Sequence, residues 1–81
     1  MKITKQYLYS GNYRNEFGGN EDRIWKRFYI LIDNNFCGEL YIEPADYLKR
    51  FRYRNGDDFL SAENYEDLKD KIKKLYLTKN R

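Results

Sequence analysis

The sequence predicts an α+β fold: a small antiparallel β-sheet of about three strands with a C-terminal α-helix packed on one face. Two observations support this prediction. Large apolar and polar side chains alternate over residues 24–33 and again over 36–42, which is the period of half-buried strands. Over residues 65–76 the apolar side chains recur every three or four residues, which is the period of an amphipathic helix. Residues 1–81 are expected to form a single domain.

The N-terminal part predicts one strand followed by a loop. Residues 2–10 alternate in character and place three apolar side chains on one face, namely Ile3, Tyr7 and Tyr9. The segment Ser10-Gly11-Asn12 ends this strand. Residues 13–22 contain Gly18-Gly19 without periodicity and predict a loop, and no Lys-Ser/Thr follows these glycines at the spacing of a phosphate-binding loop.

The central part predicts an antiparallel hairpin. One face of the strand at 24–33 carries Ile24, Lys26, Phe28, Ile30 and Ile32, and the other carries Trp25, Arg27, Tyr29 and Leu31. Asp33-Asn34-Asn35 predicts the turn, because Asn and Asp tolerate positive φ. On the returning strand one face carries Phe36, Leu40 and Ile42, and the other carries Cys37, Glu39 and Tyr41. Gly38 suits a bulge or a close backbone approach.

Residues 43–56 allow two interpretations. As a second short helix at 44–54, the segment has Pro44 in the first turn and Gly56 just beyond its end. As a strand, it alternates aromatic with basic side chains, and Asn55-Gly56 forms a hairpin turn. The helix is the favoured interpretation, and the strand stays open as the alternative.

The last element is expected to begin after a cap at Ser61 or Asn64 and to run to about Leu77. Asn64-x-x-Asp67 is typical of a capping box. The predicted buried stripe consists of Tyr65, Leu68, Ile72, Leu75 and Tyr76. Acidic residues precede basic ones along this segment, which complements the helix dipole.

The composition argues against catalysis. The 81 residues include no histidine, and the single Cys37 lacks the base that usually activates a thiol. One cysteine supplies neither a disulfide nor a zinc cluster, and the adjacent acidic pairs at 21–22 and 57–58 lack the spacing of a calcium loop. We therefore expect no enzyme activity, no cofactor and no metal. With no secretory segment after Met1 and no apolar run long enough to span a membrane, a cytoplasmic protein is expected.

Nine tyrosines, five phenylalanines and one tryptophan accompany 16 basic and 13 acidic residues, a composition suited to binding. The first candidate contact segment is basic and aromatic, with Lys49, Arg50, Arg52, Tyr53 and Arg54. The second is the sheet face that carries Trp25, with Tyr7, Tyr9, Trp25, Arg27, Tyr29 and Tyr41. If the helix covers that face, its rings form the core instead.

Three functions compete on these grounds. The first is a non-catalytic protein that binds another protein, for example a host nucleic-acid-handling complex. In size and composition alone the chain is similar to small inhibitors from phages and mobile elements that act against host defence, anti-CRISPR proteins included. The second is an RNA- or single-stranded-DNA-binding protein that uses the basic and aromatic surface. The third is a structural subunit that associates with itself, as in a homodimer.

Overall fold

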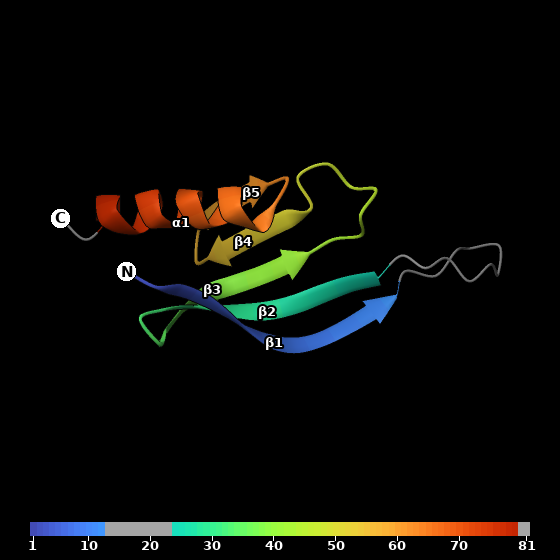
Figure 1. Ribbon diagram of the computed structural model, residues 1–81, viewed down its shortest axis with the longest axis horizontal. Coiled ribbons are helices and arrows are strands. Elements are labelled where there is room, and N and C mark those ends of the chain that lie inside the picture. Colours follow the sequence, from blue (N-terminus) through green and yellow to red (C-terminus); the bar gives the residue numbers. More distant parts are fainter. Residues whose placement is uncertain (13–23, 80–81) are drawn as a thin grey trace.

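The computed structural model describes residues 1–12 and 24–79, which form a five-stranded antiparallel sheet followed by one helix (Figure 1). The elements are β1 (Ile3–Asn12), β2 (Ile24–Ile32), β3 (Asn35–Ile42), β4 (Phe51–Asn55), β5 (Asp58–Ala62) and α1 (Tyr65–Lys79). Each strand pairs with the next along the chain, so the sheet is a simple meander in the order β1-β2-β3-β4-β5. The α+β class and the C-terminal helix are confirmed, and the expected count of about three strands is wrong. The loop predicted at 13–22 lies outside the described residues.

The helix predicted at 44–54 is wrong, because this segment turns once and then pairs as a strand. Pro44 begins only a single turn, in which the Tyr47 N–H donates to the Pro44 carbonyl over 3.0 Å. The Glu43 N–H then donates to the Arg50 carbonyl over 2.8 Å, which closes the loop and brings β4 alongside β3. The backbone of Lys49 adopts a positive φ of 50°, which helical residues do not adopt.

Two tight hairpins follow from residues that accept positive φ. Asp33 and Asn34 have φ of 51° and 68° between the paired residues Ile32 and Asn35, which is the pattern of a type I′ turn. The predicted turn at this point is confirmed. Gly56, with φ of 60°, opens the turn between β4 and β5, as glycine does in a type II′ turn.

Two β-bulges place side chains on the face of the sheet opposite to the one that simple alternation predicted. The register of β1 against β2 shifts between Tyr7 and Tyr9, so these two rings lie on opposite faces of the sheet. The register of β2 against β3 shifts beside Cys37, so Cys37 packs against the core and Phe36 faces away from it. The predicted facing of Tyr9, Phe36 and Cys37 was therefore wrong, because one extra residue in a strand inverts a period of two.

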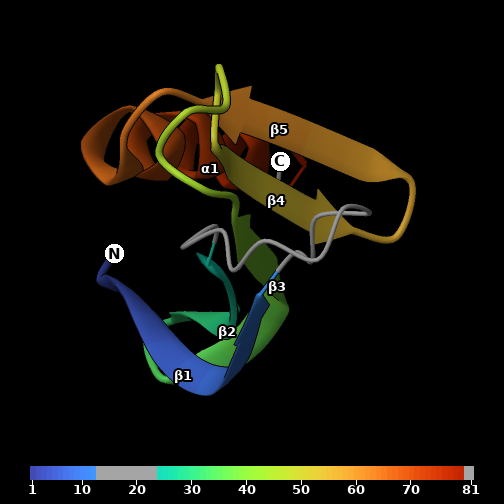
Figure 2. The same ribbon diagram turned by 90° about the vertical axis from the view of Figure 1, so that its right-hand side faces the viewer.

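The core lies between the helix and the inner face of the curved sheet. Figure 2 shows β1, β2 and β3 curving beneath the pair β4–β5, with α1 packed behind that pair. The buried apolar residues are Phe28, Ile30, Ile32, Leu40, Ile42, Tyr53, Ala62, Leu68 and Ile72. The described residues include no helix with the length and apolarity needed to cross a bilayer.

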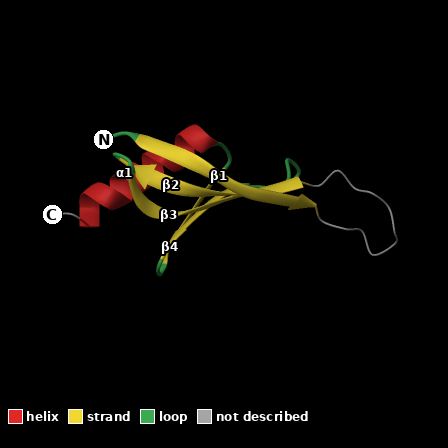
Figure 3. Cartoon of the chain, turned by 90° about the horizontal axis from the view of Figure 1, so that it is seen from below, coloured by secondary structure: helices red, strands yellow, loops and turns green. Residues whose placement is uncertain are grey.

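The helix is anchored at its start and along β5. The Asp67 N–H donates to Asn64 Oδ1 over 2.8 Å and the Asn64 amide donates to the Asp67 carboxylate over 3.1 Å, so the predicted cap at Asn64 is confirmed. Lys71 Nζ donates to the Ser61 carbonyl oxygen over 2.7 Å, which ties α1 to the outermost strand. The start of β1 and the end of α1 lie at the same end of the molecule (Figure 3).

Candidate binding surface on the open sheet face

The face of the sheet that points away from α1 is not covered by the helix, and we call it the open face. Strand register places its side chains in rows that cross the sheet, since directly paired residues project from the same face. One row consists of Tyr9, Arg27, Tyr41, Arg52 and Ser61. The next row consists of Gln6, Tyr29, Glu39, Arg54 and Phe59. In the first row tyrosines alternate with arginines across four strands, from β1 to β4, and the second row places Arg54 between Glu39 and Phe59.

Arg27 organises the centre of the open face. Its Nη1 donates to the Tyr9 hydroxyl over 2.7 Å, and its Nη2 donates to the Tyr41 hydroxyl and lies 3.4 Å from the Glu39 carboxylate. The Tyr41 hydroxyl in turn donates to that carboxylate over 2.6 Å. The guanidinium carbon lies 4.2 Å from the Tyr41 ring centroid and 5.5 Å from that of Tyr9. Both rings are therefore held in fixed positions by one arginine.

The charges in this cluster order side chains more than they stabilise the fold. Arg27 and Glu39 are partly exposed, and solvent screens ion pairs of this kind. The hydrogen bond to Glu39, together with burial, raises the pKa of Tyr41. Its phenol therefore remains protonated at neutral pH and continues to donate to the carboxylate.

Aromatic contacts extend the open face on both sides of the Arg27 cluster. Trp25 meets Tyr9 edge to face with centroids 5.8 Å apart, and Tyr29 meets Phe36 in the same way at 5.1 Å. The Trp25 ring lies directly over Gly11, where an added Cβ would sit 2.3 Å from a ring carbon. On β5, the Phe59 ring centroid lies 5.4 Å from the guanidinium carbon of Arg54.

The structure divides the basic and aromatic segment between three environments. Arg52 and Arg54 join the open face, where Arg52 lies next to the predicted sheet residue Tyr41 and Arg54 lies next to Glu39. Tyr53 is only 2% exposed and belongs to the core, because it alternates with those arginines on the inner face. Arg50 is partly buried and donates from Nε to the Glu43 carbonyl over 3.1 Å. Lys49 lies in the loop before β4.

Tyr7 is separated from the other predicted sheet residues. It lies on the inner side, where its ring meets Phe28 edge to face at 5.6 Å, and the bulge places Tyr9 on the open face. The open-face residues that were not predicted as site residues include Phe36, Glu39, Leu48 and Phe59. Recognition of β5 would have indicated Phe59, and the bulge that exposes Phe36 leaves no signal in a period of two.

A hollow of about 550 Å³ lies on the open face between the loop of residues 43–50 and strands β3 to β5. Its lining includes Tyr41, Leu48, Arg52 and Phe59. Leu48 is 84% exposed and Phe59 is 69% exposed, so two large apolar side chains at this hollow face solvent. This is the strongest concentration of uncovered apolar and cationic groups in the described residues.

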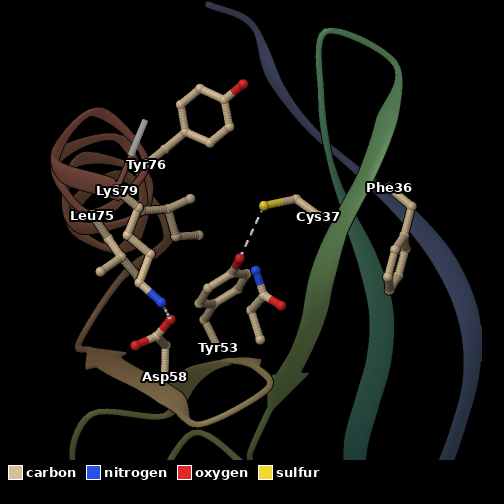
Figure 4. Close-up of a pocket in the computed structure, with 9 residues that line it drawn as sticks. Phe36, Cys37, Tyr53, Asp58, Leu75, Tyr76 and Lys79 are labelled. Carbon is tan, nitrogen blue, oxygen red and sulfur yellow. Dashed lines mark hydrogen bonds and ion pairs between the residues drawn. The ribbon is translucent and has the colours of Figure 1, made fainter. Parts of the chain in front are cut away.

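A second hollow, of about 260 Å³, lies between the end of α1 and the inner face of the sheet (Figure 4). Cys37 Sγ and the Tyr53 hydroxyl lie 3.1 Å apart there and share a hydrogen bond, while Phe36 points to the other side of β3. Burial, followed by the contact with Cys37, raises the pKa of Tyr53. The described part of the chain gathers no three His, Cys, Asp or Glu side chains in a metal-binding arrangement.

Comparison with known protein families, with curated proteins and with solved structures found no match to this chain. The assignment of function therefore depends on the chemistry of the two hollows and the open face. The open face carries Phe36, Leu48 and Phe59, the three most exposed large apolar side chains of the described residues.

Proposed function

We propose that the protein is a non-catalytic binding module that acts by protein–protein contact through its open face. The observation that carries the proposal is the cross-strand row in which tyrosines alternate with arginines, namely Tyr9, Arg27, Tyr41 and Arg52. Trp, Tyr and Arg are the residues enriched at the energetic centres of protein interfaces. Here they lie on the face that α1 leaves uncovered.

Pre-organisation supports this proposal. A side chain that is already ordered loses less conformational freedom on binding, which leaves more of the contact energy as affinity. Arg27 holds Tyr9 and Tyr41 by hydrogen bonds before any partner arrives, and Tyr9 in turn supports Trp25. The centre of the open face is therefore fixed in shape.

Exposed apolar side chains also support the proposal of protein–protein contact. Phe36, Leu48 and Phe59 are each more than 60% exposed, although a single buried side chain of this size contributes about 1.5–3 kcal/mol on transfer from water. A partner that covers them would recover that free energy. The finer assignment, an inhibitor or anti-defence protein of a phage or mobile element, rests on size and composition alone.

Site-specific photocrosslinking tests the proposal. A benzophenone amino acid is placed at Phe36 or at Phe59 on the open face, and at Leu77 on the helix as a control that is 54% exposed. In the native cells, both open-face positions are expected to crosslink to the same protein, and Leu77 is not. Crosslinks from Leu77 alone, or from none of the three positions, would overturn the proposal. A crosslink between two copies of the chain would show self-association instead.

Binding of single-stranded nucleic acid is the second candidate, and one observation favours it. Arg52 and Arg54 project beside the exposed ring of Phe59, and within the described residues neither forms an ion pair with a carboxylate. If they and Lys49 contact three phosphates, affinity for a single strand falls roughly 20-fold between about 50 and 200 mM salt. Gel shifts at those two salt concentrations measure this, and the absence of any shift at low salt removes the candidate.

A further inference from the structure

A continuous groove crosses the open face beside the loop of residues 43–50. The hollow of about 550 Å³ adjoins a smaller one of about 180 Å³, and both are lined by Tyr41 and Glu43. The smaller hollow reaches Trp25, and the larger one reaches Phe59. The groove therefore runs across four strands, a length that suits an extended segment better than a compact small molecule.

The two walls of the larger hollow are apolar. Leu48 projects from the loop on one side and Phe59 projects from β5 on the other. At 84% and 69% exposure these side chains lack a cover within the described residues, and an apolar side chain inserted between them would be shielded from water on both sides.

The rim of the same hollow is cationic. Lys49, Arg52 and Arg54 line it, against the single carboxylate of Glu43. In the part of the chain that the structure describes, neither Lys49 nor Arg52 forms an ion pair, and Arg54 lies against the Phe59 ring. The lining therefore carries three positive charges and one negative charge. Carboxylates on a bound segment would complement the net positive charge.

Main-chain hydrogen bonds fix the shape of the loop that carries Leu48. Main-chain hydrogen bonds join Glu43 to Arg50 and Tyr47 to Pro44. Lys49 adopts a left-handed backbone conformation that disfavours residues other than glycine, and such conformations concentrate at binding loops. This places Leu48 and Lys49 at the groove as a pre-formed wall.

We propose that this groove binds an acidic, apolar peptide segment of the protein partner. An apolar side chain of the segment lies between Leu48 and Phe59, and flanking carboxylates pair with Arg52, Arg54 and Lys49. The inference rests on the proposed function and names the kind of partner that the open face takes.

The chemistry of the groove favours a peptide over a nucleic acid. Leu48 offers no aromatic face on which a base would stack. The Phe59 ring already has the Arg54 guanidinium against it.

The test measures fluorescence anisotropy of short labelled peptides with the full chain. The probe alternates Glu with Leu, and the comparison probes alternate Glu with Ser and Lys with Leu. Arg52→Glu and Leu48→Ser are each expected to weaken binding of the Glu/Leu peptide about tenfold or more, as loss of a principal contact does. Matched controls on the outer side of the helix are Lys73→Glu and Leu77→Ser, which are expected to stay within about twofold of the unaltered protein. All four positions are exposed, so the variants retain the fold, and circular dichroism verifies this.

Three outcomes would overturn the inference: no binding of the Glu/Leu peptide, equal binding of the Glu/Ser peptide, or equal losses in the helix controls. Tighter binding of a labelled oligodeoxythymidine than of any peptide would also overturn it and assign the groove to nucleic acid. If the peptide fails while Phe36 and Phe59 still crosslink to one protein in cells, the proposed function stands and only the groove assignment falls.

Discussion

Replacement of Gly38 by alanine tests how tightly the sheet is packed where β3 crosses β4. Gly38 is buried next to the bulge at Cys37. An added Cβ would lie 2.7 Å from the Arg54 carbonyl oxygen and 2.7 Å from a ring carbon of Tyr53. Real Cβ atoms do not approach neighbours so closely, so one of these groups must move.

Neither group moves freely. The carbonyl belongs to the backbone of a central strand, and the Tyr53 ring is 2% exposed within the core. Overpacking of this kind costs about 1–3 kcal/mol. Displacement of the ring also weakens the hydrogen bond between the Tyr53 hydroxyl and Cys37, which adds about 1 kcal/mol. We expect Gly38→Ala to lower the free energy of unfolding by about 2–4 kcal/mol.

Urea unfolding followed by the fluorescence of Trp25 provides the assay. With an m-value near 1 kcal/mol per M, the expected loss lowers the midpoint by about 2 M or more. Gly56→Ala is the matched control, because it adds the same methyl group where no atom lies within 4 Å. Its positive φ alone costs about 1 kcal/mol. A cost for Gly38→Ala no greater than that for Gly56→Ala would contradict the close packing around Gly38.

Two further predictions concern the core and its buried phenol. Leu68→Ala is expected to lower the free energy of unfolding by about 2–5 kcal/mol, since Leu68 is fully buried, while Leu77→Ala stays within about 0.5 kcal/mol in the same urea experiment. Equal effects of the two changes would contradict the position of α1. Because the pKa of Tyr53 is raised by burial and by Cys37, the unfolded chain loses this proton at a lower pH than the folded chain. The contribution of Tyr53 is therefore constant below about pH 10 and is lost as the pH rises beyond it, so Tyr53→Phe is expected to flatten the decline of the urea midpoint there. An unchanged slope would contradict this.

Local residue chemistry was sufficient to predict the β2–β3 hairpin and the helix. Asp33 and Asn34 accept the positive φ that the turn requires, and Asn64 satisfies the first free N–H groups of α1. In both cases the signal lies within a few neighbouring residues. The inner stripe of β2 also follows directly from its alternation, with Phe28, Ile30 and Ile32 buried.

The second hairpin was predicted only as the alternative to a helix, although Asn55-Gly56 indicated its turn. Pro44 and Gly56 stand where the ends of a helix would stand, so the helix and strand interpretations were close. The pairing of β4 with both β3 and β5 decides between them, as it buries Tyr53 on one face and leaves Arg52 and Arg54 on the other. The pairing with β3 reaches across the loop of residues 43–50, and propensity does not encode it.

Only some residues of the open face were predicted, because β-bulges interrupt the alternation along β1 and β3. Arg27, Tyr29 and Tyr41 share the open face as their alternation predicted. Tyr9 and Phe36 changed faces because each lies beside a bulge, which also separates Tyr7 from Tyr9, and a bulge arises from how two strands twist against each other.

The hydrogen bond from Lys71 to the Ser61 carbonyl affects whether another chain can add to the sheet at β5. An uncovered strand edge is a template on which another chain can continue the sheet. At β5 the Ser61 carbonyl already accepts a hydrogen bond from Lys71, and the strand is only five residues long. Another chain would have to displace the Lys71 ammonium group from this carbonyl, so continuation of the sheet beyond β5 is opposed.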